Sequence, residues 1–164
     1  MEADAAPGPH PATLPDDTIL RDCTRTQLRR GGPGGQHRNK VATAVRLTHT
    51  PTGLTAEANE RRSAADNAPV ALHRLRLRLA CERRHRWAIP GAAWSARTRH
   101  GRIAVNPAHR DLPALLAESL DALHHHAGDP AATAEALGVS ASQLDKLWLL
   151  HPPAKTAARA MFPL

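Results

Sequence analysis

Apolar and polar residues alternate in the first half of the chain, where Val45 and Leu47 flank Arg46. This period of two predicts a β-strand over residues 41–48. The Pro-Thr-Gly sequence at 51–53 is a strong turn signal and should reverse the chain direction. Two further extended segments are predicted on either side of the central strand, at residues 23–30 and 54–58.

The segment 63–87 carries two periods at once. Leucines alternate with arginines as in a strand, but Leu72, Leu75 and Leu79 also share one helical stripe. Ala, Leu and Arg are strong helix formers, and the second half of the segment has no β-branched residue, so we predict a helix. Pro69 is then a defect or a delayed first turn. The start of the helix is predicted at Ser63 or Asp66.

Amphipathic helical patterns return near the carboxyl end. The first carries a leucine stripe and ends near Gly128, the second stops at Gly138, and the third is capped by Ser140. This order is helix-turn-helix-like. Pro152 and Pro153 are expected to break the third helix before a last turn. The patterns cover residues 112–123, 130–137, 140–150 and 155–161.

The order of these elements predicts an α+β fold, with a small sheet, a glycine loop and one packed helix before a helical segment. Residues 1–15 are rich in Ala, Pro and Gly and are predicted to be disordered. Asp16 or Asp17 is expected to cap a short helix. The predicted division is a disordered terminus at 1–15, a domain at 16–88, a linker at 89–107 with a short extended piece at 102–105, and a helical segment at 108–164.

Charge is distributed unevenly along the 164 residues. The net charge is +7, to which residues 1–20 contribute −4 and residues 111–164 contribute −3. Residues 21–110 carry nineteen Lys and Arg against five acids, which gives +14. A basic middle of this kind is typical of a polyanion partner, most commonly a nucleic acid. The alternative is a solvated, arginine-rich face without a partner.

The two cysteines, Cys23 and Cys81, are far apart in the sequence, which favours free thiols in a reducing compartment over a disulfide or zinc site. The amino terminus carries acids where a signal peptide needs bases, and no apolar run is long enough to cross a bilayer. We therefore expect a cytoplasmic protein with no membrane partner. Consecutive side chains on a helix point in different directions, so we interpret His124, His125 and His126 as surface residues and expect no metal site.

Glycines at four of the five positions 31–35 cannot belong to a helix or a packed strand. Glycine adopts positive φ freely and Pro33 fixes one φ, so the segment is predicted to be an exposed loop that can approach a partner closely. The Lys-Ser or Lys-Thr of a phosphate loop is absent after these glycines. The dinucleotide-binding pattern also fails, because it requires a glycine where His37 stands.

From Arg29 through Leu72 the sequence resembles the catalytic domain of the class I peptide-chain release factors. The resemblance rests on an ordered set of short segments rather than on one motif. The matching residues are 32–37, Asn39 and Lys40 in the loop, 44–49 in the following strand, 51–53 in the turn, and Glu60, Arg62, Ser63, Asn67, Ala71 and Leu72 at the start of the helix.

This resemblance implies hydrolysis of the ester that joins a finished peptide to tRNA, inside the peptidyl-transferase centre of the ribosome. Gly34, Gly35 and Gln36 would be the catalytic residues, with Gln36 positioning the attacking water and its backbone N–H stabilising the developing negative charge. No cofactor is implied. Family members often carry this glutamine methylated, so a glutamine methyltransferase is a candidate partner. The residues expected to contact RNA are Arg29, Arg30, His37, Arg38, Asn39, Lys40, Arg46, Arg61, Arg62, Arg83, Arg84 and Arg86.

We recognise no codon-reading domain in the residues before the glycine-rich stretch and therefore expect a departure from full-length release factors. The sequence is similar in this respect to rescue hydrolases, which act on stalled ribosomes without reading a codon. Those proteins usually have a basic tail, whereas residues 111–164 sum to −3. We therefore predict a codon-independent, ribosome-dependent peptidyl-tRNA hydrolase. The alternative is a non-catalytic ribosome- or RNA-binding module whose carboxy-terminal helices dock a partner.

A third interpretation is a DNA-binding regulator built on the helix-turn-helix-like segment. Its second helix offers only Lys146 beside Asp145, with two leucines and a tryptophan nearby. Because phosphate contacts depend on clustered Lys and Arg, this helix is poorly suited to DNA. DNA is not an expected partner.

Overall fold

The computed structural model describes residues 5–29 and 42–162. The chain forms two compact units, which we call the sheet unit (Pro15–Arg78) and the helical unit (Met1–Leu14 and Leu79–Leu164). The division falls within helix α3 (Ala64–Glu82), whereas the sequence predicted a domain that ends at residue 88. The amino-terminal segment and the second half of the chain therefore share one core.

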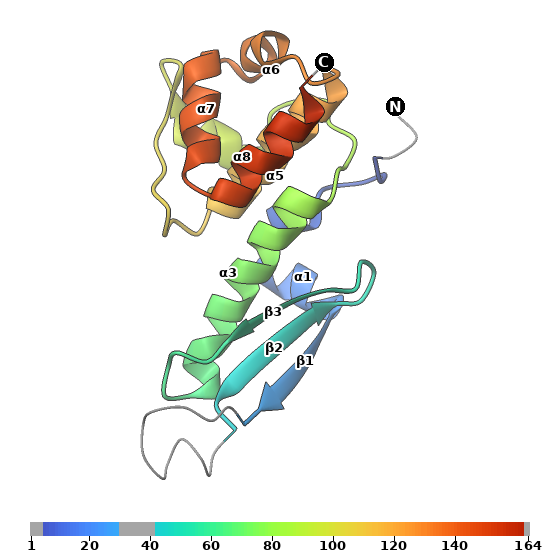
Figure 1. Ribbon diagram of the computed structural model, residues 1–164, viewed down its shortest axis with the longest axis vertical. Helices are drawn as coiled ribbons and strands as arrows, with labels where there is room; N and C mark the ends of the chain where they lie inside the picture. The colour runs from blue at the N-terminus through green and yellow to red at the C-terminus, as the bar shows by residue number, and fades with distance from the viewer. Residues whose placement is uncertain (1–4, 30–41, 163–164) are drawn as a thin grey trace. The chain divides into compact units, whose positions relative to one another are not determined.

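Three antiparallel strands form the sheet, in the order β1-β2-β3. Their bounds are Cys23–Leu28, Ala44–His49 and Leu54–Ala58, and the predicted extended segments are confirmed (Figure 1). The turn between β2 and β3 contains Gly53 with φ of 71°, a conformation that glycine adopts without a steric penalty. This turn fixes the register in which Leu47 faces Ala56.

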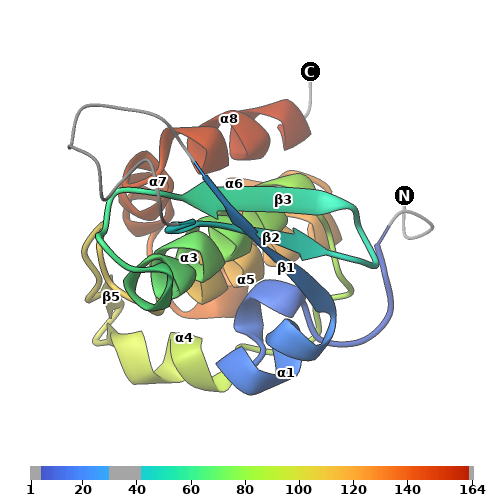
Figure 2. The same cartoon turned by 90° about the horizontal axis from the view of Figure 1, so that it is seen from below.

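Helix α3 crosses one face of the sheet (Figure 2). Alternate residues of β2 and β3, such as Val45, Leu47 and Ala56, are buried on this face. The helix contributes Ala71 and Leu75, both fully buried, which confirms the helical interpretation of the leucine stripe. Helix α1 (Asp16–Arg21) buries Ile19 in the same unit.

The starts of these two helices differ in how they are capped. The Oγ of Ser63 accepts a hydrogen bond from the N–H of Asp66 at 3.0 Å, so the predicted start of α3 is confirmed. Pro69 lies inside the helix, near its beginning. Helix α1 is capped by Pro15 without a side-chain hydrogen bond, so the predicted cap at Asp16 or Asp17 is wrong. Both acids lie in the first turn instead, where negative charge is favourable.

The alternating arginines of α3 bind strand β3 and helix α1 of the sheet unit. Arg74 donates to the carbonyl oxygen of Glu57 at 2.8 Å, and Arg78 donates to that of Thr55 at 2.6 Å. These carbonyls belong to β3, an edge strand of the sheet. Arg76 pairs with Asp16 of α1 at 2.7 Å. The alternation of arginines therefore does not mark a strand, because successive arginines of the helix bind different neighbours, β3 on one side and α1 on the other.

The helical unit is organised around α5 (Leu112–His125), whose residues from Leu112 to Leu123 are all buried. Two indoles fasten the surrounding helices. Trp94 Nε1 donates to the carbonyl of Leu137 at 2.9 Å, and Trp148 Nε1 donates to Ser119 Oγ at 3.1 Å. The surrounding elements are the 3-10 helix η2 (Pro11–Thr13), α4 (Ala92–Arg97), α6 (Pro130–Leu137), α7 (Ala141–Leu149) and α8 (Pro152–Met161).

The predicted helix boundaries around α6 and α7 are confirmed. Gly138 ends α6 in the left-handed conformation, and Ser140 Oγ caps α7 through the N–H of Gln143. The connection before α6 requires a glycine at position 128, because a Cβ there would collide with the carbonyl oxygen of Met161. None of the helices in the described residues is long and apolar enough to cross a membrane.

Three expectations for the helical unit differ from the structure. Within residues 89–107 the short extended piece predicted at 102–105 is confirmed in part by β5 (Arg102–Ile103), but α4 and the partner strand β4 (Thr98–Arg99) were not predicted. Pro152 and Pro153 open α8, because proline is tolerated in the first turn of a helix. Within the predicted disordered terminus, the described residues include η2, where Ala12 is fully buried.

Candidate functional site

The glycine-rich stretch connects β1 to β2. The last register pair of these strands is Leu28 with Ala44, so the connection leaves and re-enters the sheet at adjacent positions. Residues 30–41 lie outside the described residues. The catalytic assignment of Gly34, Gly35 and Gln36 therefore stays a prediction. The same holds for the five predicted RNA contacts in that range, which are Arg30, His37, Arg38, Asn39 and Lys40.

A fully buried asparagine fastens the β2 side of this connection. Asn67 Nδ2 donates to the carbonyl of Thr43 at 2.8 Å and to that of Arg61 at 3.1 Å. Its Oδ1 accepts from the N–H of Arg61 at 2.9 Å. One side chain thus ties three segments of the sheet unit together. The sequence marks Asn67 as part of the family resemblance but gives no sign of this bonding role.

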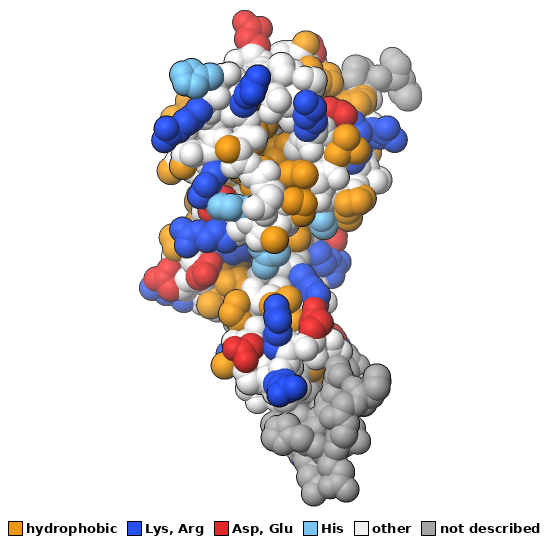
Figure 3. All heavy atoms as spheres, turned by 90° about the vertical axis from the view of Figure 1, so that its left-hand side faces the viewer, with side chains coloured by type: hydrophobic (Ala, Val, Ile, Leu, Met, Phe, Trp, Pro, Cys, Tyr) orange, Lys and Arg blue, Asp and Glu red, His pale blue; other side chains and the backbone are white. Residues whose placement is uncertain are grey.

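The predicted RNA contacts of the sheet unit fall into two groups. Arg29, Arg61 and Arg62 are exposed. Arg46 is instead paired with Glu57 across the β2–β3 ladder, so its charge is largely neutralised within the fold. On the face drawn in Figure 3, Lys and Arg side chains stand singly or in small groups among hydrophobic and acidic ones.

A second acid of the sheet unit is also held by arginine. Glu60 pairs with Arg74, and this hydrogen bond holds the pKa of the Glu60 carboxyl below its usual value. The carboxylate therefore stays ionised and paired at neutral pH, which leaves it poorly suited to act as a general base.

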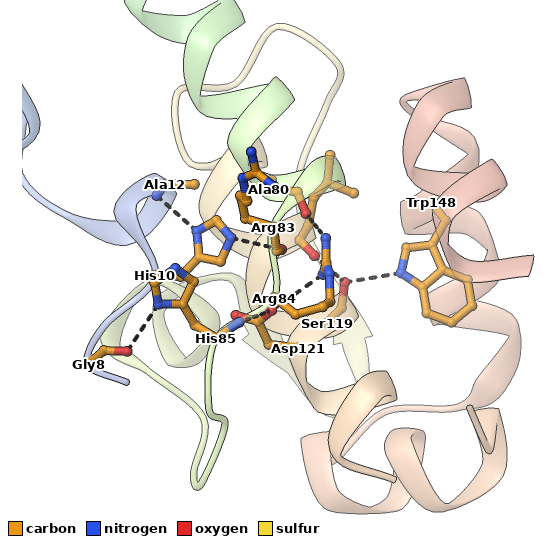
Figure 4. A network of polar contacts seen from close by, with 11 residues as sticks. Gly8, His10, Ala12, Ala80, Arg83, Arg84, His85, Ser119, Asp121 and Trp148 are labelled. Atoms are coloured by element: carbon orange, nitrogen blue, oxygen red, sulfur yellow. Dashed lines mark hydrogen bonds and ion pairs between the residues drawn. The ribbon is translucent and has the colours of Figure 1, made fainter. Parts of the chain in front are cut away.

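The run Arg83, Arg84 and Arg86 belongs to the helical unit, and its members have different environments. Arg83 and Arg86 are exposed, whereas the side chain of Arg84 is only 13% exposed. Arg84 Nη1 lies 3.3 Å from Asp121 Oδ1, which also accepts the N–H of His85 at 3.0 Å (Figure 4). This pairing does not favour the predicted contact of Arg84 with RNA, because its guanidinium already faces a buried carboxylate.

Burial shifts the pKa values of both Asp121 and Arg84 toward the neutral forms. It raises the pKa of Asp121 to about 7, while the Arg84 guanidinium and the His85 N–H oppose the rise. It lowers the pKa of Arg84 as well. A cavity of about 450 Å³ reaches Asp121 and the neighbouring Glu118, which accepts the N–H of Gly91. Both carboxylates are thus engaged within the fold.

A histidine that the sequence places in a disordered segment completes this network. His10 is 4% exposed, its Nδ1 accepts the N–H of Ala12 at 3.0 Å, and its Nε2 lies 3.3 Å from the carbonyl of Arg83 (Figure 4). This pattern requires the neutral tautomer with the proton on Nε2. Burial, with His85 and Arg84 nearby, lowers the pKa of His10 to about 3.

The described part of the chain offers neither a metal site nor a reactive cysteine. No group of three or more His, Cys, Asp or Glu there could hold a metal ion. The rings of His125 and His126 each lie 5.7 Å from that of Trp87. Both cysteines are free, and burial raises the pKa of Cys81 to about 11, so its thiol stays protonated at neutral pH.

Comparison with known proteins identifies the family. A family model described as the RF-1 domain matches residues 18–104, which is more than half of the chain. The chain belongs to the RF-1 domain family. The resemblance to the catalytic domain of class I release factors is thereby confirmed.

Individual relatives of this RF-1 domain are peptide chain release factors. The chain is 42% identical to the mitochondrial release factor 1 of Bos taurus over a match of 71 residues, and this match covers 43% of the chain. It is 53% identical to release factor 2 of Acidovorax sp. strain JS42 over 58 residues, which cover 35% of the chain. It is also 53% identical to the chloroplastic release factor PrfB1 of Arabidopsis thaliana over 71 residues, a match that covers 40% of the chain. Each match spans 16% of the relative's own length.

Proposed function

We propose that the protein hydrolyses the ester of peptidyl-tRNA on the ribosome and so releases the nascent chain. The observation that carries this proposal is membership of the RF-1 domain family, with Gly34-Gly35-Gln36 in the connection between β1 and β2. A hairpin connection whose ends are held by strand pairing and by Asn67 is a suitable mount for a loop that must enter a narrow site.

The reaction adds water across the ester. The water oxygen attacks the carbonyl carbon, the bond to the ribose oxygen breaks, and that oxygen takes up a proton as the peptide leaves with a carboxyl group. Gln36 holds the water, and its backbone N–H stabilises the oxyanion, an interaction worth roughly 3 kcal/mol. Glycines at 34 and 35 let the backbone approach the RNA wall without side-chain clashes.

Binding to ribosomal RNA would use the exposed arginines of the sheet unit. Arg29, Arg61 and Arg62 have no side-chain partner among the described residues, and guanidinium groups pair well with phosphates. In this proposal the partners are the ribosome and its peptidyl-tRNA. A glutamine methyltransferase that modifies Gln36 is a further proposed partner, which a mass measurement of the peptide containing Gln36 from the native host would test.

The deciding experiment is a release assay on ribosomes with an empty A site, a sense codon or a stop codon. We expect release from the empty site and no dependence on a stop codon. Gly35→Ala and Gln36→Ala should slow release roughly 100-fold, which is typical for loss of a transition-state contact. Gln27→Ala, at an exposed position of β1, is the matched control and should release peptide at the rate of the unchanged protein.

Other outcomes of this assay have distinct meanings. Equal release by the unchanged protein and both loop variants would refute the catalytic assignment. Ribosome binding without release from any complex would favour the non-catalytic module. Release only at a stop codon would refute codon independence while leaving the hydrolysis in place.

A further inference from the structure

The hairpin β4–β5 presents two arginines side by side. Arg99 and Arg102 are register partners, so their side chains stand on the same face of the two-residue ladder. Both are exposed, while Thr98 and Ile103 on the other face are half-buried. The connecting turn consists of His100 and Gly101, with φ of 50° and 72°.

The arginine pair beside this turn violates one local preference. Like charges directly opposite each other in an antiparallel pair are destabilising. The turn itself is an ordinary one, because positive φ at both central residues suits a two-residue hairpin and His adopts this conformation more readily than most residues. Real proteins keep such departures from local preference mainly at functional sites.

The hairpin is nevertheless held firmly to the helical unit. The N–H of Ile103 donates to Gln143 Oε1 of α7 at 3.2 Å, and the N–H of Ala104 donates to the carbonyl of Arg97 at 2.8 Å. Arg97 itself pairs with Asp111 at 2.8 Å. By contrast, Arg99 and Arg102 have no side-chain partner in residues 5–29 and 42–162. Their charges therefore do not serve the fold.

We propose that the tip of this hairpin, formed by Arg99, His100 and Arg102, binds the phosphate backbone of RNA. Two guanidiniums on adjacent strands can share one phosphate or grip two neighbouring ones, and an anion between them removes their mutual repulsion. The choice of ribosomal RNA as the partner rests on the proposed function. The hairpin would give the helical unit an RNA contact of its own, in addition to the glycine loop.

The test compares Arg99→Gln/Arg102→Gln with the control pair Arg110→Gln/Arg159→Gln, which removes the same charge from exposed positions of the helical unit. Binding to vacant ribosomes is measured at several salt concentrations. The hairpin variant should bind roughly tenfold more weakly at low salt, and the slope of log affinity against log salt should flatten by about 1.5, as expected for two lost phosphate contacts. The control pair should retain most of the affinity and slope.

Thermal unfolding of the same proteins provides a second readout. The hairpin variant should unfold at the same temperature as the unchanged protein or above it, because a repulsive pair is removed. A lower unfolding temperature would show that the arginines stabilise the fold, which would overturn the proposal. Unchanged ribosome affinity, or an equal loss in the control pair, would also overturn it.

Duplex DNA and the release assay separate the remaining outcomes. Hairpin-dependent binding to a short duplex DNA as tight as binding to the ribosome would refute the assignment to RNA. Hairpin-dependent ribosome binding without any peptide release would refute only the proposed hydrolysis. Normal release with hairpin-independent binding would refute only the inference drawn from the hairpin.

Discussion

His10 shows how a single residue can define a stable arrangement in a segment of low sequence complexity. Its ring accepts one backbone N–H and reaches one backbone carbonyl, so both nitrogens are used in the neutral form. The neighbouring sequence is rich in Ala, Pro and Gly and predicts disorder because it has few large apolar side chains. No local pattern reveals that this imidazole and Ala12 are buried against distant residues.

Burial of the neutral ring makes the stability of the protein depend on pH. The pKa of His10 is lowered from 6.5 to about 3, so the unfolded chain binds more protons than the folded one between these values. Stability from this residue is complete above pH 6.5 and is lost as the pH falls. At pH 5 the loss should be about 2 kcal/mol.

His10→Asn isolates this effect, because its side-chain oxygen can accept the N–H of Ala12 and does not titrate. The free energy of unfolding is measured in urea at pH 7.5 and pH 5. The unchanged protein should lose about 2 kcal/mol more than the variant over this interval. An equal pH response of the two proteins would contradict the assignment. The comparison also cancels Asp121, whose raised pKa acts in the opposite direction.

At the scale of elements, the first turns of α3 control the base of the glycine-rich connection. Asn67 joins Thr43, just before β2, to Arg61, just after β3. Asn67→Ala would leave one N–H and two carbonyls without this partner. We expect the sheet unit to lose about 2–4 kcal/mol of stability, from a cost of about 1–3 kcal/mol for each buried polar group partly offset by relaxation.

Hydrogen exchange on the full chain is the suitable measurement, because it resolves the sheet unit from the helical unit. Gln27→Ala is the control, since this exposed residue of β1 should cost less than about 0.5 kcal/mol. If Asn67→Ala left exchange in β2 and β3 unchanged, Asn67 would have no fastening role.

Elements with strong local signals could be predicted from the sequence. Gly53, Gly138 and Ser140 mark turns and caps that depend on their own backbone, and the strands and helices beside them follow as predicted. Elements that depend on distant contacts could not. Helix α4 is six residues long and is fixed by burial of Trp94, which no pattern in residues 89–107 indicates.

The same distinction applies to the candidate site. The family resemblance could be read from the loop and its flanks, and the family match confirms it. The environment of each arginine could not be read in this way. Arg83, Arg84 and Arg86 form one basic run in the sequence, but only the fold places a buried carboxylate beside Arg84. Periodicity does not reveal such a partner 37 residues away.

At the scale of the whole molecule, the charge of +14 over residues 21–110 overstates the positive charge that is free to bind a polyanion. Several arginines are bound to acids within the two units and contribute mainly to folding. These pairs are Arg46–Glu57, Arg74–Glu60, Arg76–Asp16, Arg84–Asp121 and Arg97–Asp111. Three of the acids lie outside that range of the sequence, so a count of charges by segment misses them.

A pair of double variants separates the two roles of arginine. Arg61→Gln/Arg62→Gln should flatten the salt dependence of ribosome binding by about 1.5 and leave stability nearly unchanged. Arg74→Gln/Arg76→Gln should leave the salt dependence unchanged and lower the free energy of unfolding by about 1–2 kcal/mol, because folded partners lose their donors. Equal effects of the two variants on binding would show that only net charge matters.

All three tryptophans of the chain belong to the helical unit, where two of them fasten helices through their indole N–H groups. The sheet unit contains no aromatic residue of the Phe, Tyr or Trp type. Intrinsic fluorescence therefore reports on the helical unit and is blind to the unit that carries the glycine-rich connection. A tryptophan introduced at an exposed position of β1, such as Gln27→Trp, would give the sheet unit an optical signal of its own.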